Sequence, residues 1–78
     1  MPMIAGMGMK PDEIFQLIIK ADERLKYATD ERGAARRKQA RDLLAQARAA
    51  AEEIGNAGLI EQAQRRLTDL QTLEDGAG

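Results

Sequence analysis

The residues that could do chemistry in this chain are carboxylates, amines, guanidinium groups and one phenol, because it contains no His, Cys or Ser. The absence of Cys excludes disulfides and thiolate metal sites. Without His and Ser, the commonest general base and a serine nucleophile are missing too. We interpret Tyr27, the single phenol, as a packing residue rather than a catalytic acid. The sequence therefore predicts a protein that is not an enzyme and uses no cofactor.

Adjacent carboxylates are the first candidates for a metal site. They occur at four places: Asp12-Glu13, Asp22-Glu23, Asp30-Glu31 and Glu52-Glu53. Neighbouring residues on a helix point about 100° apart, so the two carboxylates of a pair do not converge on one ion. Helical di-iron sites also combine Glu with His, which this chain lacks. We expect no metal site, and we interpret the pairs as helix-start charges and exposed polar faces.

A basic stretch in the middle of the chain is the strongest charge asymmetry. Residues 24–48 carry a net charge of +5, and residues 49–78 carry −4. The densest part is a basic patch made up of Arg36, Arg37, Lys38 and Arg41. It could bind nucleic acid or an acidic protein, or its charges could pair with acidic segments of this chain or of a second subunit. Because no aromatic residues interleave with the arginines, base stacking is not supported, and nucleic acid is the less favoured partner.

Three amphipathic helices are expected to position these residues, over about 11–28, 32–54 and 58–73. Ala, Leu, Glu, Gln, Arg and Lys account for 47 of the 78 residues, which is a helix-forming composition. Short turns between the helices predict antiparallel neighbours in an all-α, three-helix arrangement. Apolar residues recur at helical spacing in three stripes: Ile14, Ile18, Ala21, Leu25, Ala28; Ala40, Leu43, Leu44, Ala47, Ala51, Ile54; and Leu59, Ile60, Ala63, Leu67, Leu70, Leu73.

The first two helices cannot be continuous, because their apolar stripes do not line up. Twelve residues separate Ala28 from Ala40, which would leave an offset of about 120° between the stripes in one straight helix. Thr29, Asp30 and Gly33 lie in this interval and favour a turn. A second break is predicted at Gly55-Asn56, a pair that favours the left-handed geometry closing a helix.

The two ends are expected to lie outside the folded domain, which covers residues 11–73. Residues 1–10 contain all four Met residues and predict a mobile arm, while residues 74–78 predict a frayed tail. Without His or Cys to anchor it, a copper site in the arm is not favoured. We recognise neither a signal peptide nor a membrane span, and therefore expect a cytoplasmic protein. The bias towards Ala, Arg and Gly is compatible with a GC-rich bacterial genome.

The run Ala40-x-x-x-Leu44-x-x-Ala47 places small residues on either side of a large one. It resembles the second helix of a tetratricopeptide repeat, and residues 21–73 as a whole are similar to the helical hairpins of that family. The three-helix size also resembles the microtubule-interacting and trafficking domain, which binds peptide helices. The chain departs from the repeat pattern because the usual aromatic of the first helix has no counterpart. The resemblance implies a repeat-like hairpin plus one helix, acting as a protein-binding scaffold without catalysis.

The first helix carries more apolar surface than a small bundle can cover, which predicts self-association. Chains of this length often gain stability by forming oligomers. We therefore predict a small interaction module that forms a dimer or higher homo-oligomer, with another protein as a further partner. A nucleic-acid-associated protein using the basic patch is the alternative. The predicted subunit interface consists of Ile14, Phe15, Leu17, Ile18 and Ile19.

Overall fold

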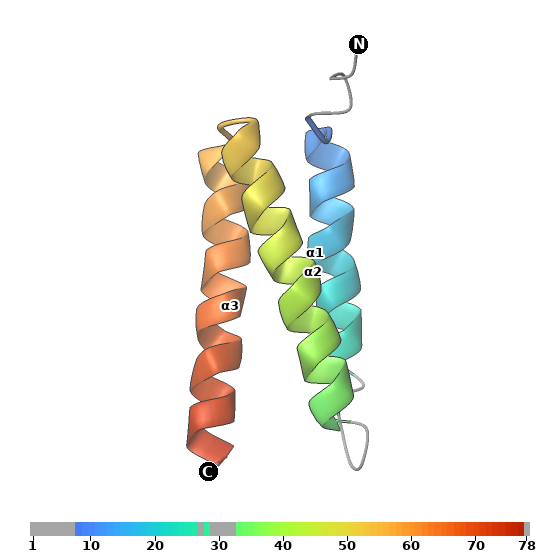
Figure 1. The fold of residues 1–78 in the computed structure, drawn as a ribbon, viewed down its shortest axis with the longest axis vertical. Helices are drawn as coiled ribbons and strands as arrows, with labels where there is room; N and C mark the ends of the chain where they lie inside the picture. Colours follow the sequence, from blue (N-terminus) through green and yellow to red (C-terminus); the bar gives the residue numbers. More distant parts are fainter. Residues whose placement is uncertain (1–7, 27, 29–32, 78) are drawn as a thin grey trace.

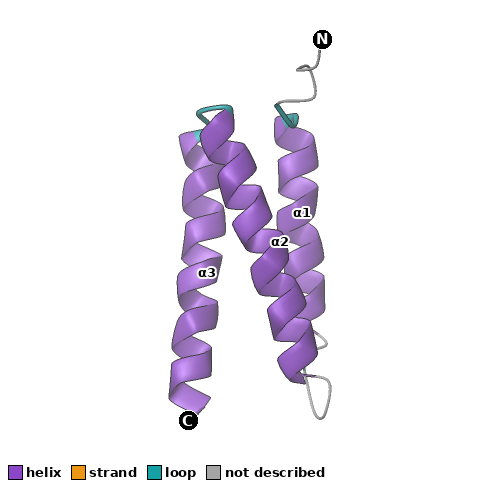
Figure 2. Ribbon diagram, in the orientation of Figure 1, coloured by secondary structure: helices purple, strands orange, loops and turns teal. Residues whose placement is uncertain are grey.

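The computed structural model describes residues 8–26, 28 and 33–77. These residues form three helices and no strand: α1 (Pro11–Lys26), α2 (Gly33–Glu53) and α3 (Ala57–Ala77). Figure 1 shows them as an elongated bundle in which α2 crosses diagonally between α1 and α3. Consequently, α2 packs on both other helices, whereas α1 and α3 make far less contact with each other. The all-α, three-helix prediction is confirmed, as the colouring in Figure 2 makes plain.

Helix α1 begins at the predicted residue, where a proline and two carboxylates combine. Pro11 occupies the first helical position, where its missing N–H is not needed. The backbone N–H of Lys10 donates to Oε1 of Glu13 over 2.9 Å, which is the carboxylate half of a capping box. The N–H of Ile14 then donates to the carbonyl of Lys10 over 3.0 Å. The Asp12-Glu13 pair therefore stabilises a helix start, as the sequence indicated.

The turn between α2 and α3 closes one helix and opens the next within three residues. Gly55 has a φ of 68°, and its N–H donates to the carbonyl of Glu52 over 3.1 Å. The N–H of Asn56 donates to the carbonyl of Ala51 over 2.9 Å, which completes a Schellman motif. Oδ1 of Asn56 in turn accepts from the N–H of Leu59 over 3.1 Å, capping α3. This tight connection fixes α3 as the antiparallel neighbour of α2.

The helix ends differ from the predicted ones by a few residues. Helix α1 ends at Lys26 rather than at residue 28, and the predicted turn residues Thr29 and Asp30 lie outside the described residues, as does Tyr27. Helix α3 extends to Ala77 through most of the tail predicted to fray. Two contacts hold that last turn: Nε2 of Gln71 donates to Oδ1 of Asp75 over 3.1 Å, and Glu74 is paired with Arg41 of α2.

The core forms where the predicted stripes meet. Ile14, Ile18 and Leu44 are the largest fully buried side chains, and five of the ten buried apolar residues in the described part are alanines. Because alanine ends at Cβ, it lets helices approach closely where larger side chains would hold them apart. The buried alanines are Ala21, Ala40, Ala47, Ala51 and Ala63.

The end of the predicted arm is held against the bundle. Met9 packs against the core, and a Cβ added to Gly8 would lie 3.3 Å from Cγ2 of Ile54. These contacts place Gly8 beside the turn that joins α2 to α3 and Met9 on the core. The rest of the predicted arm, residues 1–7, lies outside the described residues.

Candidate functional site

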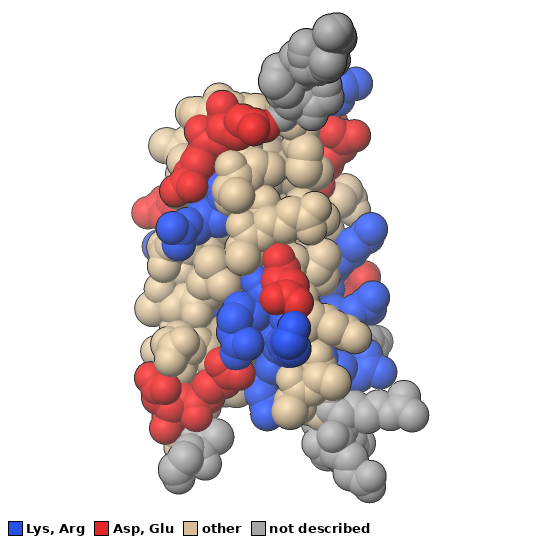
Figure 3. Space-filling model, in the orientation of Figure 1, with Lys and Arg blue, Asp and Glu red and all other residues tan. Residues whose placement is uncertain are grey.

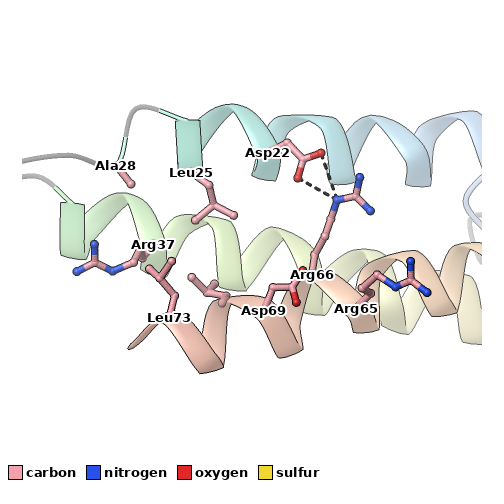
Figure 4. A pocket seen from close by; sticks show the side chains of 9 residues that line it. Asp22, Leu25, Ala28, Arg37, Arg65, Arg66, Asp69 and Leu73 are labelled. Atoms are coloured by element: carbon pink, nitrogen blue, oxygen red, sulfur yellow. Dashed lines mark hydrogen bonds and ion pairs between the residues drawn. The ribbon is translucent and has the colours of Figure 1, made fainter. Parts of the chain in front are cut away.

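A groove lies between α1 and α3 at the end of the bundle where α1 ends and α2 begins. It has a volume of about 610 Å³ and exists because α1 and α3 both pack on α2 more than on each other. Figure 4 shows Leu25 and Leu73 pointing into this space from opposite sides. We call it the α1/α3 groove. Its lining consists of Asp22, Leu25, Ala28, Arg37, Arg65, Arg66, Asp69, Leu70 and Leu73.

The apolar part of the α1/α3 groove comes from one leucine of α1 and two of α3. Leu70 is only 3% exposed and belongs to the core, so it forms the floor. Leu25 is half-buried beside it. Leu73 is 59% exposed although it lies only three residues beyond Leu70 on the same helix. Leu73 is therefore apolar surface above a leucine floor that the described residues leave to solvent.

An ion pair between α3 and α1 borders the α1/α3 groove. Nε of Arg66 lies 2.9 Å from Oδ1 and 3.2 Å from Oδ2 of Asp22, as the dashed lines in Figure 4 show. Nη1 of Arg66 also donates to the carbonyl of Gln62 over 3.4 Å. Both charged side chains remain partly exposed, so the pair contributes at most about 1 kcal/mol to stability. Its larger effect is to neutralise Asp22 within the groove lining.

The four residues of the predicted basic patch differ in their contacts. Arg41 is paired with Glu74 of α3, and Nζ of Lys38 lies 3.3 Å from Oδ2 of Asp42 on the same helix. Arg37 instead lines the α1/α3 groove, and Arg36 is half-buried. Figure 3 shows basic and acidic side chains interleaved on the face that α2 crosses. Arg41 thus pairs with an acid of the carboxyl-terminal segment, whereas Lys38 pairs with an acid of the basic stretch itself.

The predicted interface on the first helix is divided between the core and the surface. Ile14 and Ile18 are fully buried in the core. They cannot contact a second subunit, so they do not belong to the interface in which the sequence analysis placed them. Leu17 and Ile19 are half-buried, while Phe15 is 41% exposed. The excess of apolar residues on this helix is explained chiefly by packing within the chain, which periodicity alone does not distinguish from packing between chains.

The exposed remainder of that interface lies beside the α1/α3 groove. Phe15, Ile19 and Asp22 are spaced by four and three residues, which places them on one side of α1. Asp22 pairs with Arg66 of α3, so this side of α1 is turned towards α3. Phe15 and Ile19 therefore continue the groove side of α1 towards the start of the helix.

Sequence reasoning did not single out Arg65, Arg66 or Asp69, which form much of the charged lining. Their spacing in the sequence was the one signal that could have placed them together. Arg66 and Leu73 are seven residues apart and share a side of the third helix, and Arg65 and Asp69 are four apart on its neighbouring side. This spacing shows which residues share a face, but it does not show that α1 stands opposite.

Comparisons with protein families, with curated proteins and with solved structures gave no match for this chain. The resemblance to tetratricopeptide repeats therefore stays a prediction. No helix in the described ranges has an apolar stretch long enough to cross a lipid bilayer. Among the same residues, no three carboxylates gather closely enough to hold a metal ion.

Proposed function

We propose that this chain is a non-catalytic protein–protein interaction module that takes up a helix of another protein in the α1/α3 groove. The observation that carries the proposal is Leu73, which is 59% exposed above the leucine floor of that groove. A partner helix laid along α1 and α3 would bury Leu73 and complete a four-helix arrangement. The resemblance of residues 21–73 to tetratricopeptide and trafficking-domain hairpins supports the same kind of function.

The described residues just before α1 lie at the opposite end of that helix from the α1/α3 groove. Gly8 and Met9 lie beside Ile54 and the core at the start of α1, whereas Leu25 and Ala28 mark the groove at its other end. From Pro11 to Leu25, α1 rises about 21 Å.

A separate protein is a better partner than a second copy of this chain. With Ile14 and Ile18 in the core and Leu17 packed against it, self-association through α1 rests chiefly on Phe15 and Ile19. The exposed area of these two side chains is small compared with the roughly 800 Å² that each partner of a stable complex buries. A cytoplasmic location belongs to the same proposal, and the absence of cysteine is compatible with it.

Replacing Leu73 with aspartate tests the proposed function. The probe is a synthetic helical peptide of about four turns, with leucines on one face and glutamines at both ends of that face, here called the glutamine peptide. We expect Leu73→Asp to raise its dissociation constant at least about tenfold, because the new carboxylate would be desolvated against the bound leucines. Fluorescence anisotropy of the labelled peptide measures the constant.

The matched control is Ala49→Asp, which adds the same charge at an exposed position of α2 outside the α1/α3 groove. We expect this variant to bind the glutamine peptide like the wild type, and circular dichroism checks that both variants stay helical. Equal binding by the wild type and Leu73→Asp would contradict the proposal, and so would the absence of binding to the wild type. Light scattering could instead show that the wild type forms a stable dimer and that Leu73→Asp abolishes it. The occupant of the α1/α3 groove would then be a second copy of this chain rather than a separate protein.

A further inference from the structure

Arg37 and Arg65 differ from the arginines that join the helices. Arg41, Arg48 and Arg66 each have an acceptor on a neighbouring helix, namely Glu74, Gln64 and Asp22. Arg37 and Arg65 line the α1/α3 groove, yet neither makes a hydrogen bond or ion pair with any residue that the structure describes. Within the described part of the chain, their guanidinium groups are therefore available to a partner.

The two arginines stand at opposite ends of the leucine-lined part. Figure 4 shows Arg37 at the end near Ala28 and Arg65 at the other end, with Leu25 and Leu73 between them. Nη1 of Arg37 would lie 2.9 Å from a Cβ built on Gly33, so its guanidinium group lies over the first turn of α2. The α1/α3 groove thus presents apolar surface between two cations.

The carboxylates of the α1/α3 groove do not cancel this charge. Asp22 is paired with Arg66, which leaves Asp69 as the remaining acid of the lining. Asp69 lies four residues from Arg65 on α3, but the described structure has no ion pair between them. The side chain of Arg65 extends away from Asp69 in Figure 4. With Asp22 and Arg66 neutralised, two arginines face one carboxylate, and the groove keeps a positive surplus.

We propose that the partner helix is acidic: its apolar face is flanked by carboxylates that pair with Arg37 and Arg65. This inference rests on the proposed function. A guanidinium group binds a carboxylate through two parallel hydrogen bonds, which adds orientation to affinity. From Arg65 to Leu73, α3 rises about 12 Å, so carboxylates about two to three turns apart on one face of the partner would reach both arginines.

The whole-molecule charge sharpens this inference. The chain carries a net charge of −1, so its long-range field slightly disfavours an acidic ligand. A preference for an acidic helix can therefore come only from charges next to the bound ligand. The effect of Arg37 and Arg65 on peptide binding can therefore be distinguished from general electrostatic attraction.

The test compares the glutamine peptide with two versions in which glutamate or lysine replaces each flanking glutamine. We expect the wild type to bind the glutamate peptide about fivefold more tightly than the glutamine peptide, which corresponds to two partly exposed ion pairs. The lysine peptide should bind most weakly, and the preference should shrink as salt rises. The double variant Arg37→Gln/Arg65→Gln should bind all three peptides with similar constants.

The matched control is Lys20→Gln/Arg24→Gln, which removes the same charge from exposed positions of α1 outside the groove. We expect this variant to keep the preference for glutamate. Equal binding of the three peptides by the wild type would overturn the inference and leave the proposed function standing. Loss of the preference in the Lys20→Gln/Arg24→Gln control would overturn it too, because the effect would then be one of net charge. If the wild type binds none of the peptides, the proposed function itself fails.

Discussion

Replacing Leu44 with alanine is expected to lower the free energy of unfolding by about 3 kcal/mol. Leu44 is fully buried on α2, the helix that packs on both others. The substitution removes apolar contacts and leaves a cavity between helices. Five of the other nine buried apolar residues are alanines, whose side chains are too short to refill it. A chain of this length has a total stability of only about 4–12 kcal/mol. The loss is therefore a large share of the whole.

Urea unfolding followed by far-UV circular dichroism measures this loss. The control is Leu43→Ala on the same helix, where the side chain is only half-buried and the expected loss is about 1 kcal/mol or less. Both substitutions remove the same atoms and give the same helix propensity, so the difference reports burial alone. Equal losses for the two variants would contradict the described core.

Enlarging Ala47 to leucine is the second substitution with a large expected effect. Ala47 is fully buried on the same face of α2 as Ala40, Leu44 and Ala51. Three added carbons have no space there, so neighbouring side chains or a helix must shift, at a cost of about 1–3 kcal/mol. The measurement is the urea midpoint, which should fall with an unchanged slope.

The control for that substitution is Ala49→Leu, at an exposed position of α2. Leucine and alanine have similar helix propensities, and we expect the free energy of unfolding of this variant to stay within about 0.5 kcal/mol of the wild type. An Ala47→Leu variant more stable than the wild type would show that the helices leave room at this position. It would also contradict the role of the alanines as close helix contacts.

Much of the fold could be predicted from local signals in the sequence. The start of α1 follows from Pro11 and Glu13, and the end of α2 follows from Gly55 and Asn56, because capping depends on residues next to one another. The offset between the stripes ending at Ala28 and starting at Ala40 required a break, and Lys26 and Gly33 bound it in the structure. The ten buried apolar residues of the described part also fall on the predicted stripes.

The candidate site could not be predicted, because it depends on how the helices lie relative to one another. Periodicity places Leu73 on the apolar stripe of α3, but its exposure follows from where α1 and α2 lie. The pairs Asp22–Arg66 and Arg41–Glu74 join residues far apart in the sequence. Without them, Arg41 and Arg37 looked equivalent as partner residues, although one is paired within the chain and the other lines the α1/α3 groove.

The central claim is that a partner helix binds in the α1/α3 groove. The most direct measurement is a map of backbone-amide chemical-shift changes in the isotope-labelled chain as the glutamate peptide is added. We expect the largest changes at Leu25, Arg37, Arg65, Leu70 and Leu73, the residues that line the groove. Changes centred instead on exposed residues outside it, such as Ala49 or Arg24, would contradict the claim, and so would a spectrum that does not change.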